Sequence, residues 1–298
     1  MIKTVKNPLI QPFLKWAGGK RQLLPEIRKY VPEAFDTYYE PFVGAGAVLF
    51  DLQPENAVIN DKNTELLNVY HVIKNEIEDL IKELKKHEDG NDPDYFYEVR
   101  AMDREPSFKD LSPAERAARI IYLNKTCFNG LFRVNSKGYF NVPFGKYKNP
   151  KILNEAVLRA VHYYLHSNDV QILEMDFTEA VANVKAGDFV YFDPPYDPLS
   201  ETASFTSYSL DGFRKEDQLR LRDLCVELDQ KGIKFLISNS ATDFIMQIYK
   251  EKGFIIEKVS ASRNINSVAS KRGKIEEVLV RNYGQVDKSM ISIVEHKK

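Results

Sequence analysis

The chain has 298 residues, 43% of them hydrophobic and 29% charged, which is the composition of an ordinary folded protein of one large or two modest domains. Collagen-like, low-complexity and disordered classes are therefore excluded. Lys and Arg number 42 against 43 Asp and Glu, so the net charge of -1 excludes a uniformly basic coat for nucleic acid.

Cysteine content and hydropathy narrow the class further. The two cysteines, Cys127 and Cys225, are too few for a disulfide framework or a four-thiolate metal site, and they indicate reduced thiols. No stretch approaches the roughly 18 apolar residues that a membrane span needs. We therefore expect a cytoplasmic protein without a membrane partner.

The basic residues are grouped. Residues 1–25, 124–151 and 258–275 contain no acidic residue, and acid-rich helical patterns lie between them. Any one such run is more typical of solvated surface, but three of them together predict a positive face that meets phosphates.

Short apolar runs closed by glycine, asparagine or aspartate indicate buried parallel strands, and helical patterns separate several of them. In chain order, the predicted strands are residues 37–43, 56–60, 169–175, 188–193, 233–239, 254–260 and 276–283. The alternation predicts an α/β protein with a doubly wound, Rossmann-like sheet. Ligand chemistry is then expected at the carboxyl ends of the strands.

The alternation stops between residues 66 and 165. Helical patterns there surround residues 128–150, in which two aromatic-rich extended runs flank Asn135-Ser136-Lys137-Gly138, a sequence typical of a hairpin turn. We therefore predict an α/β domain of residues 1–65 and 166–298, with residues 66–165 as an inserted helical domain that carries a β-hairpin.

The string EPFVGAGAVLF, residues 40–50, indicates a strand, a glycine turn and a helix. Gly44 and Gly46 allow a tight turn and close approach to a ligand. Leu49 stands where the dinucleotide fingerprint needs Gly or Ala, which disfavours nicotinamide and flavin cofactors. Leu14 and Arg21 likewise exclude a phosphate loop around the nearby Gly-Gly-Lys.

Two acidic residues follow further predicted strands. Asp61 can accept hydrogen bonds from both ribose hydroxyls of an adenosine, or it can cap the next helix; the sequence leaves both open. Asp176 and Phe177 offer a carboxylate and an aromatic ring that could hold an adenine.

The most specific string is Asp193-Pro194-Pro195-Tyr196, directly after the run at 188–193. Two prolines fix the backbone, so the carbonyls point in set directions. If Asp193 and the Pro194 carbonyl each accept an N–H from a planar exocyclic amine, its nitrogen can pyramidalise and attack an electrophile, while Tyr196 stacks on the ring. The alternative is an ordinary turn after a strand.

These strings resemble a known family. The sequences DPPY and EPFVGAG are similar to those of amino-methyltransferases that use S-adenosylmethionine, and FLKWAGGK at 13–20 resembles the Dam-type, D12 class of DNA adenine methyltransferases. The likeness runs from Phe13 to about Tyr283. NGLFRVN and FNVPFGKYKNP resemble the recognition hairpin of enzymes that methylate adenine in GATC, both maintenance enzymes and modification partners in type II restriction systems.

The resemblance implies a cofactor site in a catalytic domain made of residues 1–65 and 166–298. Trp16 and Lys20 would hold the methionine end of S-adenosylmethionine, and Asp61 would bind its ribose. Asp176 and the Phe177 backbone would contact its adenine. The implied cofactor-binding residues are Trp16, Lys20, Phe42, Gly44, Gly46, Asp61, Asp176, Phe177 and Asp193.

The resemblance also implies that residues 66–165 form a target-recognition domain. Arg133 would read a guanine edge, because its guanidinium matches O6 and N7 in the major groove. Phe128 would wedge into the base stack near the target. The implied DNA-contacting residues are Lys15, Phe128, Asn129, Leu131, Arg133, Asn135 and Pro143, and the implied catalytic residues are Asp193, Pro194 and Tyr196.

The implied reaction is direct, in-line methyl transfer to the N6 amine of an adenine flipped out of double-stranded DNA, with no metal. Covalent C5-cytosine chemistry is excluded, because Thr126 precedes Cys127 and Leu224 precedes Cys225 where a proline is required. Resemblance alone favours a bacterial or phage restriction-modification system, with a companion endonuclease in function only. The alternatives are N4-cytosine methylation, a catalytically weak sequence-specific DNA-binding protein and, less favoured, an RNA substrate.

Overall fold

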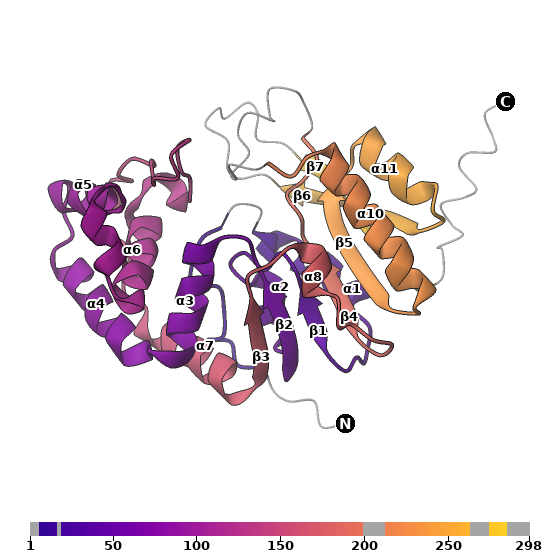
Figure 1. Ribbon diagram of the computed structural model, residues 1–298, viewed down its shortest axis with the longest axis horizontal. Helices are drawn as coiled ribbons and strands as arrows, with labels where there is room; N and C mark the ends of the chain where they lie inside the picture. The colour runs from indigo at the N-terminus through magenta and orange to yellow at the C-terminus, as the bar shows by residue number, and fades with distance from the viewer. Residues whose placement is uncertain (1–5, 17–18, 199–211, 263–273, 285–298) are drawn as a thin grey trace.

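A single seven-stranded sheet forms the centre of the protein (Figure 1). The structure is a computed structural model that describes residues 6–16, 19–198, 212–262 and 274–284. Within these ranges the strand order is β3-β2-β1-β4-β5-β7-β6. The strands are β1 (Tyr38–Glu40), β2 (Asn56–Asn60), β3 (Asp169–Leu173), β4 (Phe189–Phe192), β5 (Lys234–Ser240), β6 (Ile255–Ser262) and β7 (Lys274–Arg281).

Neighbouring strands from β3 to β5 are parallel, and β7 is antiparallel between β5 and β6. The chain order reverses between β1 and β4, which leaves a crevice at their carboxyl ends. This arrangement confirms the predicted doubly wound, Rossmann-like α/β sheet.

Helices cover both faces of the sheet. In β4, Phe189 and Tyr191 pack into one core cluster, whereas Val190 and Phe192 pack into the other. One face carries α1 (Leu24–Tyr30), α2 (Ala47–Leu52), α3 (Thr64–Asn75) and α7 (Glu155–Ser167), and the other carries α8 (Phe177–Ala180), α10 (Lys215–Gln230) and α11 (Asp243–Lys250). Burial on both faces explains why the strands are continuous apolar runs in the sequence.

Between β2 and β3 the chain leaves the sheet and forms a helical part beyond the β3 edge (Figure 1). It contains α4 (Ile77–Asp89), α5 (Pro93–Ala101), α6 (Pro113–Thr126) and the short 3-10 turns η2 (Met102–Arg104), η3 (Pro106–Asp110) and η4 (Phe128–Gly130). Buried residues of α3, α4, α6 and α7 belong to the same core cluster as those of the sheet. The predicted boundaries at residues 66 and 165 fall inside α3 and α7, the helices that join the two parts.

Residues 127–150, which we call the hairpin segment, fold back on themselves with two antiparallel bridges, Cys127 to Phe144 and Val134 to Phe140. At the turn, the Asn135 Oδ1 accepts the N–H groups of Lys137 and Tyr139 at 2.9 and 3.1 Å. Gly138 has a φ of 82°, which favours glycine. The outline of the predicted hairpin is present, but it consists of bridges instead of continuous strands.

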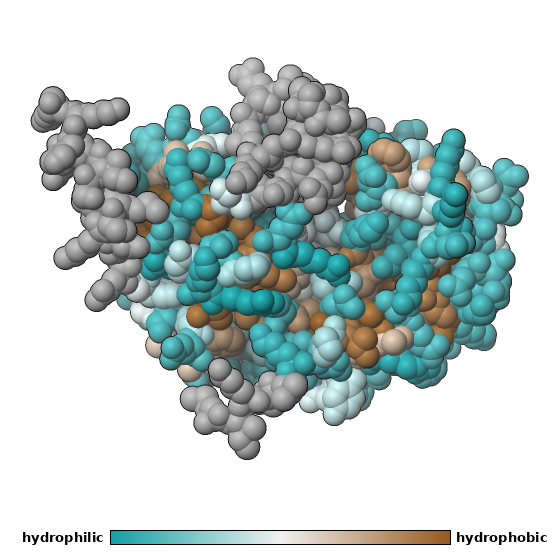
Figure 2. Space-filling model, turned by 180° about the vertical axis from the view of Figure 1, so that it is seen from behind, coloured by the Kyte–Doolittle hydropathy of each residue, from teal (hydrophilic) through white to brown (hydrophobic). Residues whose placement is uncertain are grey.

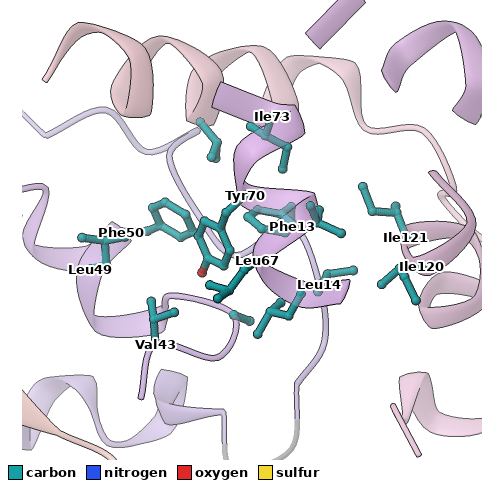
Figure 3. Close-up of a cluster of buried hydrophobic side chains, with 14 of the residues drawn as sticks. Phe13, Leu14, Val43, Leu49, Phe50, Leu67, Tyr70, Ile73, Ile120 and Ile121 are labelled. Atoms are coloured by element: carbon teal, nitrogen blue, oxygen red, sulfur yellow. The ribbon is translucent and has the colours of Figure 1, made fainter. Parts of the chain in front are cut away.

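Phe13 anchors the amino-terminal segment in the core beside the glycine turn (Figure 3). Its ring meets that of Tyr70 edge-on, with the centroids 5.1 Å apart. From behind, the surface is largely hydrophilic, with hydrophobic residues visible between the polar ones (Figure 2). Among the described helices, none combines the length and the apolar character that crossing a membrane requires.

Candidate functional site

The glycine turn lies between the end of β1 and the start of α2, and its backbone conformation admits no side chain. Gly44 and Gly46 have φ angles of 49° and 71°. A Cβ on Gly46 would lie 2.7 Å from the Tyr70 hydroxyl oxygen and 2.8 Å from the Phe50 ring. The absence of side chains at this turn therefore lets Tyr70 and Phe50 pack directly against the main chain.

Asp61 follows β2 and is tied to this turn. Its Oδ2 accepts the Gly44 N–H at 3.0 Å, and its Oδ1 accepts the Asn63 N–H at 3.0 Å. Burial raises the pKa of Asp61, while these hydrogen bonds oppose the rise. The cap of α3 is Asn63, whose side chain accepts the Leu66 N–H, so the structure does not use Asp61 as the helix cap. Each carboxylate oxygen has a further lone pair with which it can accept a hydrogen bond from a ligand at the carboxyl end of β2.

Trp16 connects the glycine turn to the hairpin segment. A Cβ on Gly44 would meet the Trp16 ring at 3.0 Å, so the indole lies directly against the turn. The same indole stacks on Phe132, with centroids 4.9 Å apart and planes inclined by 24°. Trp16 therefore contacts both the glycine turn and the hairpin segment. Ala17 and Gly18 of the same motif lie outside the described residues.

Asp193 lies at the end of β4, and two side chains contact the same oxygen of its carboxylate. Its Oδ1 accepts the Lys20 Nζ at 2.7 Å and the Ser238 hydroxyl at 2.8 Å. Because the Ser238 hydroxyl donates to Asp193, it accepts from the Tyr191 hydroxyl, 2.9 Å away. Burial raises the pKa of Asp193, whereas Lys20 and Ser238 favour its charged form. Within the described part of the chain, nothing donates a hydrogen bond to its Oδ2.

Tyr196 is fixed by two further contacts. Its hydroxyl donates to Glu277 Oε2 of β7 at 2.7 Å, and the Lys20 ammonium lies 4.5 Å from its ring centroid. The ring therefore has a set position beside Asp193. The sequence analysis did not identify Glu277 or Ser238, because both belong to strands that are distant in the chain.

A buried polar network supports the loop after β4. Gln218 of α10 donates to the Pro195 carbonyl at 2.9 Å and accepts from Asn239 of β5 at 3.0 Å. Asn239 in turn accepts the Asp197 N–H at 3.1 Å, and the Thr242 hydroxyl donates to the Asp197 carboxylate at 2.7 Å. No hydrogen bond to the Pro194 carbonyl occurs among the described residues.

Asp176 and Phe177 begin α8 at the carboxyl end of β3. Asp176 caps this helix through Thr178, and its carboxylate pairs with Arg220 at 2.9 Å and with Lys62 at 3.3 Å. The ring of Phe177 lies 5.4 Å from that of Phe42, with Phe213 beside both. The expected adenine contact by Asp176 stays a prediction, and any such contact must share this carboxylate with two cations.

Lys15 and the hairpin segment are held together by one side chain. Asn124 of α6 accepts the Lys15 N–H at 2.9 Å and donates to the carbonyls of Lys15 and Gly130 at 2.8 and 3.0 Å. Lys15 therefore lies next to Gly130, the residue that follows Phe128 and Asn129, although more than a hundred residues separate them in the sequence. Asn129 adopts a left-handed φ of 57° that turns the chain here.

The other expected DNA-contacting residues differ in exposure. Phe128 is 46% exposed, and Arg133 and Pro143 are also exposed, whereas Leu131 is half-buried. The Arg133 Nε donates to the Asn141 Oδ1 at 2.7 Å, which orients the guanidinium. Asn135 instead uses its side-chain oxygen to form the hairpin turn.

The residues around the crevice fit a nucleoside cofactor with a charged end: Asp61 offers a carboxylate at the end of β2, and Phe42 and Phe177 offer aromatic faces. In the described ranges no group of three or more His, Cys, Asp and Glu is placed to hold a metal ion.

The chain was compared with known proteins. Residues 16–265 match the family model of the D12 class N6 adenine-specific DNA methyltransferases. The chain is 48% identical over 280 residues to a type II methyltransferase, M1.LlaDCHI, of Lactococcus lactis subsp. cremoris, covering 94% of this chain and 98% of the relative. It is 44% identical over 292 residues to the type II methyltransferase M.MjaIII of Methanocaldococcus jannaschii, covering 92% and 99%. A DNA adenine methylase of Escherichia coli (strain K12) is 34% identical over 269 residues, covering 90% and 93%.

Proposed function

Because the chain belongs to the family of D12 class N6 adenine-specific DNA methyltransferases, we propose that it methylates the adenine of GATC in double-stranded DNA, with S-adenosylmethionine as methyl donor. The observation that carries this proposal is the arrangement at Asp193. Lys20 and Ser238 occupy one carboxylate oxygen, while the second oxygen and the adjacent Pro194 carbonyl accept no hydrogen bond from the described residues. Two acceptors are therefore available for the two N–H groups of an exocyclic amine.

The cofactor would be held by the residues around the crevice. The turn at Gly44 and Gly46 borders it, Trp16 and Lys20 face its charged end, and Asp61 binds its ribose. Asp176, Phe177 and Phe42 contact its adenine. When bound, the donor supplies a methyl group on a sulfonium sulfur.

The residues of this chain activate the target. Asp193 Oδ2 and the Pro194 carbonyl each accept one N–H of the adenine amine, which directs its lone pair away from the ring. The Tyr196 ring, fixed by Glu277, stacks on the base. As the new N–C bond forms and the S–C bond breaks, the amine releases one proton, for which Asp193 is the adjacent acceptor.

The target amine is paired in a duplex, so the adenine must leave the helix at a cost of a few kcal/mol. Phe128, at 46% exposed, is an apolar side chain available to enter the stack beside the vacated position. Asn124 bonds the backbone of both Lys15 and Gly130, and Arg133 is bonded to Asn141 within the hairpin segment. These two cations are our candidates for reading the guanines of GATC.

We further propose that the enzyme is the modification partner of a type II restriction system. Two relatives that match over nearly their whole length are type II methyltransferases. A maintenance role is the alternative, since other relatives are DNA adenine methylases. Protection of DNA by this enzyme against a GATC-cleaving endonuclease would support the first role.

Asp193→Ala tests the proposed chemistry. We expect methyl transfer to fall by about 10³-fold or more, because the amine loses its positioned acceptor, while cofactor affinity falls by less than about tenfold. The measurement is transfer of labelled methyl to duplexes varied one base at a time around GATC, with cofactor binding followed separately. Asp243→Ala, an exposed change on α11, is the control.

Near-normal turnover of Asp193→Ala would remove Asp193 from the mechanism. A labelled N4-methylcytosine product would replace adenine by cytosine as target. DNA binding without any transfer by the unmodified protein would favour a catalytically weak DNA-binding protein.

A further inference from the structure

A cavity of about 210 Å³ borders the amino-terminal segment, and neither Asp61 nor Asp193 lines it. It opens between this segment, the carboxyl-terminal half of α6 and the start of α7. Its walls are formed by Gln11, Pro12, Phe13, Arg21, Ile121, Lys125, Ile152, Asn154, Val157 and Leu158. None of these residues belongs to the proposed cofactor or base-reading sets.

Two cations line this cavity, and no acid does. Lys125 is half-buried, and the described residues give it neither an ion pair nor a hydrogen bond. Burial, together with the nearby charges of Lys15, Arg21 and Lys151, lowers the pKa of Lys125 to about 8. Among the described residues, Arg21 has one hydrogen bond, a long contact of 3.4 Å to the Gln11 carboxamide.

Such an arrangement is unfavourable without a counter-charge. A cation taken out of water loses hydration, and like charges around it add repulsion. The two acid-free segments 1–25 and 124–151 meet here, so no acidic side chain of either segment can neutralise it. An anion in the cavity would relieve both costs.

The size of the cavity limits the anion. Pockets for drug-sized ligands and cofactors measure about 300–1,000 Å³. At about 210 Å³ this cavity suits a single phosphate group better than a whole nucleotide. Lysine and arginine donors, with the Asn154 carboxamide in the wall, match the oxygens of phosphate.

We propose that the cavity lined by Lys125 and Arg21 binds a phosphate group. Its source is the backbone of the bound duplex, an assignment that rests on the proposed function. Lys125 follows Asn124, whose side chain is hydrogen-bonded to the N–H and the carbonyl of Lys15. A phosphate in the cavity would therefore lie near Lys15, one of the proposed base-reading residues. Free inorganic phosphate is the other source of the same chemistry.

The first arm of the test measures duplex binding against salt concentration for the full chain. Removing one phosphate contact lowers the slope of log K against log salt by about 0.9. We expect this loss in Lys125→Gln and in Arg21→Gln, with unchanged preference for GATC. Lys82→Gln, an exposed change on α4, is the matched control and keeps the slope.

The second arm measures thermal unfolding without DNA. Lys125→Gln removes an unpaired, half-buried charge, so we expect a higher Tm than that of the unmodified chain. Rising inorganic phosphate, compared with chloride at equal ionic strength, is expected to raise the Tm of the unmodified chain and not that of the variant. A change in this arm alone identifies free phosphate as the source, and a change in the salt slope alone identifies the duplex.

The proposal is overturned if Lys125→Gln and Arg21→Gln match the unmodified chain in both arms. Its failure is distinguishable from failure of the proposed function. Methyl transfer at low salt should persist in Lys125→Gln, whereas an unmodified chain that methylates no duplex would refute the function and leave the phosphate arm interpretable.

Discussion

Arg133 shows how one exposed residue can be prepared for recognition. A long guanidinium side chain loses conformational entropy on binding, but here Asn141 holds its Nε at 2.7 Å before any DNA is present. The remaining terminal N–H groups of the guanidinium can donate to the O6 and N7 of a guanine. The residue is therefore suited to specificity more than to general affinity.

Arg133→Ala should relax sequence preference at a single base pair. Loss of a bidentate contact lowers the discrimination there by about 1–3 kcal/mol. Methyl transfer to duplexes with each substitution in GATC measures this. Lys148→Ala is the comparison. Loss of a phosphate contact weakens binding to all duplexes alike and lowers the salt slope by about 1. Unchanged discrimination in Arg133→Ala would assign the guanine to another residue.

Single residues also show where the sequence was insufficient. Asp61 has two functions open to it from the sequence, and only the structure shows that Asn63 caps α3 while Asp61 holds the glycine turn. The side-chain oxygen of Asn135 forms the hairpin turn, and its expected contact with DNA stays a prediction. Asparagine serves both purposes with the same group, so the residue type alone cannot separate them.

At the scale of elements, the loop after β4 depends on its neighbours. Pro194 and Pro195 remove two N–H donors, so this loop cannot hold itself through its own main chain. Gln218 of α10 and Asn239 of β5 supply the missing bonds, and both are fully buried. The position of the catalytic loop is therefore set by two elements that follow it in the chain.

Gln218→Met tests this dependence. The change keeps the side-chain volume roughly constant but leaves the Pro195 carbonyl and the Asn239 amide unpaired, at about 1–3 kcal/mol each. We expect a lower free energy of unfolding and a kcat that falls more than cofactor affinity. Gln247→Met on α11 removes an exposed bond and is the control. If Gln218→Met and Gln247→Met lowered kcat and the free energy of unfolding by the same amounts, Gln218 would have no special role in positioning the loop.

The elements themselves were predictable to different degrees. β2 occupies residues 56–60 as predicted, because both of its faces are covered and four of its five residues are buried. β1 is shorter than predicted, since Pro41 cannot donate to a neighbouring strand. The network around Gln218 left no signal in the sequence, because hydrogen-bonding partners in separate elements have no fixed spacing.

On the scale of the whole molecule, a near-neutral chain still carries a local positive region. Two of the three acid-free segments meet around Lys15 and Lys125, while acidic residues lie on helices such as α4 and α10. Most of the third segment, 258–275, lies outside the described residues. The net charge is thus a poor guide to DNA binding, and the distribution of charge in space is what matters.

A shared core links the inserted helices to the sheet. His87, in α4, gives this part of the core a pH-dependent stability that can be measured. His87 of α4 is buried, stacks on Tyr122 with centroids 4.9 Å apart, and contacts the Tyr95 hydroxyl at 2.8 Å. Burial lowers the pKa of His87 from 6.5 to about 4. The unfolded chain therefore binds this proton at a higher pH than the folded one does.

The contribution of His87 to stability is complete above about pH 6.5 and is lost as the pH falls towards 4, by about 3 kcal/mol in total. His87→Gln should flatten this acid limb in denaturant unfolding measured between pH 7 and 4, whereas His166→Gln, on the exposed end of α7, should keep it.

Since one core spans both parts, probes in the sheet and in α4 to α6 should report the same transition. Two separated transitions would show that the inserted part unfolds by itself, and an unchanged acid limb in His87→Gln would place the titrating group elsewhere.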